Sequence, residues 1–165
     1  MSEITLRING KQRRVTVEGR TLLVDLIRDQ MNLTGTHVGC DTSQCGACVV
    51  KLDGDTVKSC TVLTATLPEG TEITTIEGVS TGDLHPMQEA FSKCHGLQCG
   101  FCTPGLVVTA IDIVERSPDG LSASQVRKAL KGNLCRCTGY QNIVASVLEG
   151  ARAMGVQVTE EKETV

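Results

Sequence analysis

Residues 40–48 read CDTSQCGAC, and this stretch decides how the first half of the chain is interpreted. Three thiol groups this close together can wrap one side of a compact inorganic centre only if the backbone turns tightly, with its amides directed at the sulfurs. Gly39, Gly46 and Ala47 permit that approach, because larger side chains would collide with the centre. Inward N–H groups would also stabilise negative charge on the sulfurs. The stretch therefore predicts a metal-binding loop.

The spacing of Cys40, Cys45 and Cys48 is C-x4-C-x2-C, the pattern of plant-type [2Fe–2S] ferredoxins. Cys60 follows after eleven intervening residues and supplies a fourth thiol. In plant ferredoxins the fourth cysteine lies farther along the chain. The arrangement therefore indicates a relative of ferredoxin rather than a free ferredoxin.

A second set of cysteines lies in the other half of the chain. Cys99 and Cys102 are separated by two residues, and Cys135 and Cys137 follow after 32 more, with one residue between them. A disulfide between Cys135 and Cys137 would be severely strained, so these two thiols are expected to hold a shared metal centre from one side. Arg136 adds a positive charge beside it. Both sets in one short chain predict two [2Fe–2S] clusters.

The cysteines allow two other assignments. Cys94 repeats the C-x4-C-x2-C spacing with Cys99 and Cys102, but a helix predicted through Cys94 argues against ligation, and a buried free thiol is the commoner fate. Two four-cysteine zinc sites would fit the ligand count, although zinc sites usually pair two C-x2-4-C motifs. The three histidines, His37, His85 and His95, are predicted to lie beside the sites or on the surface.

Composition narrows the class of protein. The 165 residues include one Tyr, two Phe and no Trp, so each small core must rely on aliphatic side chains, and bound metal would help to stabilise it. The net charge is -3 without a basic stripe, which argues against nucleic acid or a membrane surface as partner. No secretory signal or membrane-spanning run is apparent, so we expect a reducing cytoplasm, where clustered cysteines bind metal.

The hydrophobic pattern predicts two domains, an α+β arrangement. In residues 1–78, alternation around Asn9-Gly10 and Asp53-Gly54 predicts hairpins, residues 72–76 a last strand, and residues 22–31 a helix capped by Thr21. In residues 79–155, helices are predicted over 85–95, 104–116, 123–131 and 141–154. The caps expected are Thr103 before Pro104, and a capping box of Ser122 with Gln125. Residues 156–165 are expected to form a loose tail.

Longer stretches around the cysteines resemble the iron–sulfur motifs of the xanthine oxidase family of molybdenum hydroxylases. Residues 34–48 read TGTHVGCDTSQCGAC and are followed by KSCT at 58–61. Residues 96–105 read GLQCGFCTPG and residues 132–140 read GNLCRCTGY. The resemblance covers residues 3–155. The chain is similar in length and pattern to the separate small subunits of the bacterial enzymes. Aerobic carbon monoxide dehydrogenase is the nearest resemblance, and quinoline-, nicotine- and isoquinoline-type hydroxylases share the pattern.

The resemblance implies a β-grasp ferredoxin domain followed by a four-helix [2Fe–2S] domain. It implies a large subunit with molybdenum on molybdopterin, commonly the cytosine dinucleotide, and a medium subunit with FAD, assembled as a dimer of heterotrimers. Electrons would pass from molybdenum to the second cluster, then to the first cluster and to FAD. Gln98 and Cys137 match positions that approach the pterin. Cys94 has no role in the family pattern.

Two further hypotheses stay open. The chain could be a free-standing two-cluster ferredoxin or redox sensor, which would purify without molybdenum or flavin. It could also be a zinc-stabilised interaction module, which would be colourless in the visible range. The substrate of a hydroxylase would meet another subunit, so carbon monoxide, N-heteroaromatic compounds and aldehydes are all open.

Overall fold

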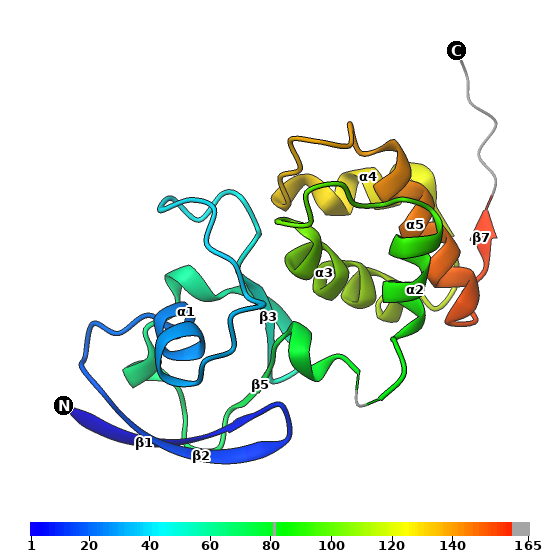
Figure 1. Cartoon of the computed structure of the whole chain (residues 1–165). Coiled ribbons are helices and arrows are strands. Elements are labelled where there is room, and N and C mark those ends of the chain that lie inside the picture. The colour runs from blue at the N-terminus through cyan, green and yellow to red at the C-terminus, as the bar shows by residue number, and fades with distance from the viewer. Residues whose placement is uncertain (81, 160–165) are drawn as a thin grey trace.

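The computed structural model describes residues 1–80 and 82–159. Figure 1 shows two units side by side, a sheet unit built from the first half of the chain and a helical unit built from the second. Each unit has its own cluster of buried side chains: one includes Leu6, Leu26 and Val50, and the other includes Phe91 and Leu106. The α+β architecture expected from the hydrophobic pattern is confirmed.

The sheet unit contains one five-stranded sheet of order β2-β1-β5-β3-β4. β1 pairs in parallel with β5, whereas the other neighbours are antiparallel. Asn9-Gly10 and Asp53-Gly54 form the two predicted hairpin turns, with positive φ at all four residues, because such turns match the twist of the strands. The strands are β1 (Ser2–Ile8), β2 (Lys11–Val17), β3 (Val49–Leu52), β4 (Asp55–Lys58) and β5 (Glu72–Thr74).

One helical segment crosses the sheet. It begins as α1 (Leu23–Asp25) and continues as a π-helical turn, η1 (Leu26–Gln30), within the range predicted for a helix. The expected cap at Thr21 is wrong. The N-cap is Leu22, which has no side-chain cap, because the Thr21 carbonyl accepts the N–H of Thr64 and Leu22 forms a bridge with Leu63. Pairing with the 3-10 region (η2, Ser59–Thr61; η3, Thr64–Thr66) therefore replaces a side-chain cap.

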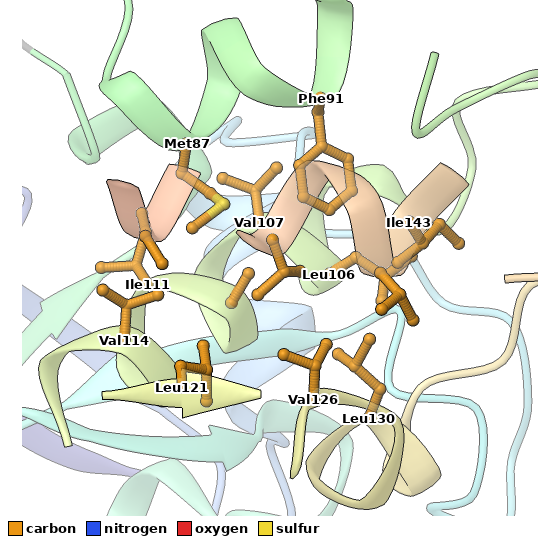
Figure 2. Packing of buried hydrophobic residues seen from close by; sticks show 14 of the residues in the cluster. Met87, Phe91, Leu106, Val107, Ile111, Val114, Leu121, Val126, Leu130 and Ile143 are labelled. Carbon is orange, nitrogen blue, oxygen red and sulfur yellow. The ribbon is translucent and has the colours of Figure 1, made fainter. Parts of the chain in front are cut away.

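The helical unit contains four α-helices in the predicted places. Figure 2 shows Met87 and Phe91 of α2 packing with Leu106 of α3 and Ile143 of α5 in a core of mainly aliphatic side chains. A 3-10 turn, η4 (Ile76–Gly78), precedes the unit, and another, η5 (Leu130–Gly132), follows α4. The helices are α2 (Pro86–Lys93), α3 (Thr103–Glu115), α4 (Ala123–Ala129) and α5 (Gln141–Ala153).

The helix caps differ in part from the prediction. The Ser122–Gln125 capping box of α4 is confirmed, with both reciprocal hydrogen bonds formed. The cap expected at Thr103 is wrong: Thr103 is the first residue of α3, and Cys102 is the N-cap. A second capping box, in which His85 and Gln88 cap α2, was not predicted.

The tail is shorter than expected. Residues 158–159 form β7 (Val158–Thr159), which pairs in parallel with β6 (Leu121–Ser122). The N–H of Leu121 also donates to the Gln157 carbonyl over 2.9 Å, and Val156 and Val158 pack on the helical core. Partial burial of two valines explains why this part of the predicted loose tail packs on the helical unit. Residues 160–165 lie outside the described residues.

The two units are joined by polar contacts between α3 and the β3–β4 hairpin. Arg116 donates to Asp112 at 2.9 Å and to Asp55 at 2.6 Å, and the Thr56 hydroxyl donates to Asp112 at 3.2 Å. These contacts hold α3 across the sheet unit. Within residues 1–80 and 82–159, no helix combines the length and apolarity needed to cross a membrane.

Candidate metal centres

The first set of cysteines converges on one side of the sheet unit. Cys40, Cys45 and Cys48 lie in the loop before β3, and Cys60 lies in η2, just after the β3–β4 hairpin. The Cys60 thiol interacts electrostatically with the other three, most strongly with Cys48. None of the nine cysteines forms a disulfide. The hairpin therefore brings the predicted fourth thiol back to the loop.

Backbone amides in this loop are directed at sulfur, as the sequence predicted. The N–H of Cys45 donates to Cys40 Sγ over 3.4 Å, and N–H groups of Thr42 and Gln44 also act on this sulfur. These donors lower the pKa of the Cys40 thiol to about 6. Burial raises the pKa of Cys60 to about 11. The loop thus favours a thiolate at Cys40, whereas Cys60 needs a bound cation to lose its proton readily.

Lys58 fixes the shape of the first loop. Its Nζ donates to the carbonyls of Ser43 and Gln44, at 2.7 and 3.4 Å, and the buried Ser59 hydroxyl donates to the Cys48 carbonyl at 2.7 Å. These donors satisfy three carbonyls of the loop and so tie its backbone to the strand that leads to Cys60. The role of Lys58 was not predicted, because nothing in the order of residues shows which carbonyls a lysine will reach.

The second set of cysteines converges at the start of α3. Cys99 and Cys102 come from the turn before this helix, and Cys135 and Cys137 come from the loop before α5. The sulfurs of Cys99 and Cys137 lie 3.5 Å apart, and Cys102 interacts with Cys135. Cys99 and Cys137 are exposed, whereas Cys135 is buried. One side of this site is therefore open at the protein surface.

Local donors and burial perturb these thiols in opposite directions. The N–H of Phe101 is the main reason that the pKa of Cys99 is lowered. Burial raises the pKa of Cys102 to about 12. Burial would also raise the pKa of Cys135, but the Thr138 hydroxyl, 3.1 Å from its sulfur, and nearby backbone N–H groups outweigh it and lower that pKa.

Tyr140 holds the second loop in place. Its hydroxyl accepts the N–H of Cys135 at 2.8 Å and donates to the Asn133 carbonyl at 3.2 Å. Its backbone adopts a positive φ of 70° at the N-cap of α5. The chain's one tyrosine therefore ties the Cys135–Cys137 turn to the start of a core helix.

The chemistry of both sites fits a binuclear cluster. Within residues 1–80 and 82–159, no three His, Cys, Asp or Glu side chains converge as they would on a single ion. A [2Fe–2S] cluster asks for only two thiolates per iron, which the pairing of Cys99 with Cys137 and of Cys102 with Cys135 offers. The buried hydroxyl of Thr103, next to Cys102, has no partner among the described atoms, and a cluster sulfur would be a suitable acceptor.

The remaining candidate residues lie around these sites. Cys94 is half-buried at the C-cap of α2 rather than buried within a helix, and the thiols of the second set act mainly on one another. Gln98 is exposed beside Cys99. His95 is exposed, and His85 caps α2.

Contacts between the two cysteine loops were not predicted. The N–H of Leu134 donates to the Cys45 carbonyl over 2.8 Å, and Asn133 Nδ2 donates to the Gly46 carbonyl over 3.4 Å. On the other side, His37 stacks on Phe101, with ring centroids 4.7 Å apart. The stretch from Leu134 to Cys135 thus links the two sites through backbone atoms. The buried Asn133 gave no such signal in the sequence.

Two family models match the chain. The 2Fe-2S iron-sulfur cluster binding domain matches residues 6–75, and the [2Fe-2S] binding domain matches residues 75–148. Each match contains one of the two cysteine sets.

Characterised relatives match over nearly the whole chain. The 6-hydroxypseudooxynicotine dehydrogenase complex subunit beta of Paenarthrobacter nicotinovorans is 46% identical, over 88% of this chain and 91% of that protein. The caffeine dehydrogenase subunit gamma of Pseudomonas sp. strain CBB1 is 44% identical, over 96% of each. Among solved structures, quinoline 2-oxidoreductase from Pseudomonas putida 86 matches with a TM-score of 0.86 and 42% identity, covering 92% of this chain and 94% of that one.

Proposed function

Because this chain belongs to the small [2Fe–2S]-binding subunits of the molybdenum hydroxylase family, we propose that it carries electrons from a molybdenum subunit to a flavin subunit. The chain is the electron-transfer subunit of a multi-subunit oxidoreductase, so the substrate reacts in another subunit. When bound, each cluster supplies one-electron chemistry, and the protein supplies position and electrostatic surroundings.

We assign the ligands to two sets of four thiols. Three features support the assignment: the thiols of each set interact with one another, backbone N–H groups face Cys40 and Cys99, and each set falls within one [2Fe–2S] family match. The first set is Cys40, Cys45, Cys48 and Cys60; the second is Cys99, Cys102, Cys135 and Cys137.

The hydrogen bond from Leu134 N–H to the Cys45 carbonyl is the observation that best supports a relay between the sites. Leu134 is bonded to Cys135, so a ligand of the second site is connected to a ligand of the first by backbone bonds and one short hydrogen bond. The exposed side of the second site, with Gln98, Cys99 and Cys137, would face the molybdopterin. Electrons would then enter at the second site and leave from the first toward FAD.

An apolar surface surrounds the exposed side of the second site. Leu97, Phe101 and Leu134 flank the cysteines of this site in the sequence and are 38%, 48% and 58% exposed, and exposed apolar patches mark protein–protein contacts. We propose that the large molybdenum subunit covers this surface and that a medium FAD subunit contacts the first site. The assembly would be a dimer of heterotrimers in the cytoplasm, with molybdopterin cytosine dinucleotide as the molybdenum cofactor.

The relatives named above favour an N-heteroaromatic substrate for the complex. Their names give 6-hydroxypseudooxynicotine, caffeine and quinoline as the compounds oxidised. The sequence motifs favoured carbon monoxide dehydrogenase, but none of these three relatives is named as an enzyme that acts on carbon monoxide. Aldehydes are the alternative class. Since this chain does not contact the substrate in the proposed scheme, assays of the purified complex must decide between the classes.

Metal analysis and EPR of the complex purified under native conditions test this function. We expect about four iron atoms per chain, two distinct [2Fe–2S] signals after dithionite reduction, and molybdenum and FAD in the same complex. Four irons without molybdenum or flavin would favour the free-standing ferredoxin or redox sensor. Zinc in place of iron would contradict both.

A further inference from the structure

His37 connects the two cysteine loops through its side chain. It lies three residues before Cys40, and its ring stacks on that of Phe101, between Cys99 and Cys102, at an interplanar angle of 20°. Its Nδ1 lies 2.7 Å from the Phe101 carbonyl oxygen. A carbonyl can only accept, so Nδ1 must carry the hydrogen. This fixes the tautomer and gives the contact a direction.

The first loop holds His37 rigidly. Its backbone N–H donates to the Ala47 carbonyl at 3.3 Å, and Arg28 donates to the carbonyl of the preceding, buried Thr36 at 2.7 Å. Phe101 also touches this loop directly, since a Cβ placed on Gly39 would lie 3.3 Å from Phe101 Cε1. The Phe101 ring therefore sits on the first loop and is held there by His37.

The backbone of Phe101 lies beside Cys99, a proposed ligand of the second site. Its backbone N–H acts on the Cys99 sulfur and lowers the pKa of that thiol. Its carbonyl, in the next peptide group, accepts from His37. A shift of the Phe101 backbone would alter the donation to Cys99. The first loop thus influences a hydrogen bond at the second site through a single side chain.

We propose that His37 is a positioning residue for both cysteine sites: its Nδ1–H holds the Cys99–Cys102 turn against the first loop, and so fixes where the Phe101 backbone lies beside Cys99. This inference rests on the proposed function. The Leu134–Cys45 bond ties the other turn of the second site to the same loop. The two contacts hold both turns of the second site; the His37 contact is made by a side chain, and the Leu134 contact by backbone atoms alone.

The test compares three variants of the native complex by iron analysis and EPR-monitored redox titration. His37→Phe keeps a ring for stacking but loses the donor. His37→Asn keeps an N–H donor near the position of Nδ1 but loses the stack. His95→Asn is the matched control, because His95 is an exposed histidine of the helical unit and takes the same substitution.

We expect the His37→Phe variant to keep its iron. The equilibrium constant for electron transfer between the two clusters should change by up to about tenfold, which is ~59 mV for a one-electron couple. The second cluster should become harder to reduce, because weaker N–H donation stabilises added negative charge less. His37→Asn and His95→Asn should titrate like the wild type.

Three results would overturn the proposal. They are unchanged potentials in His37→Phe, equal shifts in His37→Phe and His37→Asn, and loss of iron from both variants, which would make His37 a folding residue. A wild-type complex without two [2Fe–2S] signals would instead contradict the proposed function, before any variant is compared.

Discussion

Gly105 of α3 packs backbone to backbone on Gly46 of the first cysteine loop: a Cβ on Gly105 would lie 2.2 Å from the Gly46 carbonyl oxygen. The helix that starts at the second cysteine site therefore rests directly on the loop of the first. This contact sets how closely the two units can approach.

Gly105→Ala should destabilise the protein although alanine favours helices. The added methyl cannot avoid a backbone carbonyl, and such overpacking costs about 1–3 kcal/mol, more than the helix gains. Gly150→Ala in α5 is the matched control, since its Cβ would meet the flexible end of Met87. Urea unfolding followed by circular dichroism measures both. Equal stability of the two variants would contradict the close contact.

Cys94 and Cys135 should respond differently to serine. Cys94→Ser should retain both clusters, because Cys94 ends α2 outside the second set of thiols. Cys135→Ser should lose the second cluster while keeping the first, and should uncouple substrate oxidation from flavin reduction. Iron content and EPR signals measure the outcome. Loss of a signal in Cys94→Ser would overturn the ligand assignment.

The contact between α3 and the sheet unit should depend on Asp112. Its side chain is mostly buried and accepts from both Arg116 and Thr56. Asp112→Ala should lower the free energy of unfolding by about 1–3 kcal/mol, because it removes hydrogen bonds to a charged group. Glu3→Ala breaks an exposed pair with Arg14 and should lower the free energy of unfolding far less, because solvent screens this pair. Comparable losses would show that the interface contributes little.

His85 should make stability depend on pH. Its Nδ1 accepts the Met87 N–H as the cap of α2, which requires the neutral ring. Burial lowers the pKa of His85; Glu115 opposes this and Lys51 adds to it. The unfolded chain therefore binds the proton more tightly. The contribution of His85 is fully present above the ordinary value of about 6.5 and is lost as the pH falls from there toward the lower folded pKa.

The measurement is the urea midpoint of the wild type and of His85→Asn between pH 5 and pH 8, a range set by the ordinary histidine value of about 6.5. Asparagine caps helices without titrating, so the variant should lose less stability on acidification. His95→Asn should behave like the wild type. Parallel pH profiles for all three proteins would exclude the cap as the cause.

Local patterns in the sequence predicted most of the fold. The Asn9-Gly10 turn, the Ser122–Gln125 box and the four helices all depend on residues close together along the chain. The Thr103 cap failed because the turn carrying Cys99 and Cys102 runs straight into the helix, which makes Cys102 the N-cap.

The cysteine spacing predicted which thiols come together, but not what surrounds them. The Lys58 contacts to the first loop and the His37–Phe101 stack join residues whose distances along the chain follow no motif. Asn133, which is 6% exposed, reaches Gly46 across 87 positions. Such contacts depend on how the two units dock, and periodicity carries no information about docking.

The hydrogen bond between Leu134 and Cys45 limits which substitutions position 134 can accept. Both bonded atoms belong to the backbone, and the Leu134 side chain is largely exposed, so nineteen of the twenty genetically encoded residues could occupy position 134 and still donate. Proline alone has no N–H to give. Proline at position 134 should therefore break the link between the two loops, whereas an apolar replacement keeps both the hydrogen bond and the surface proposed to meet the large subunit.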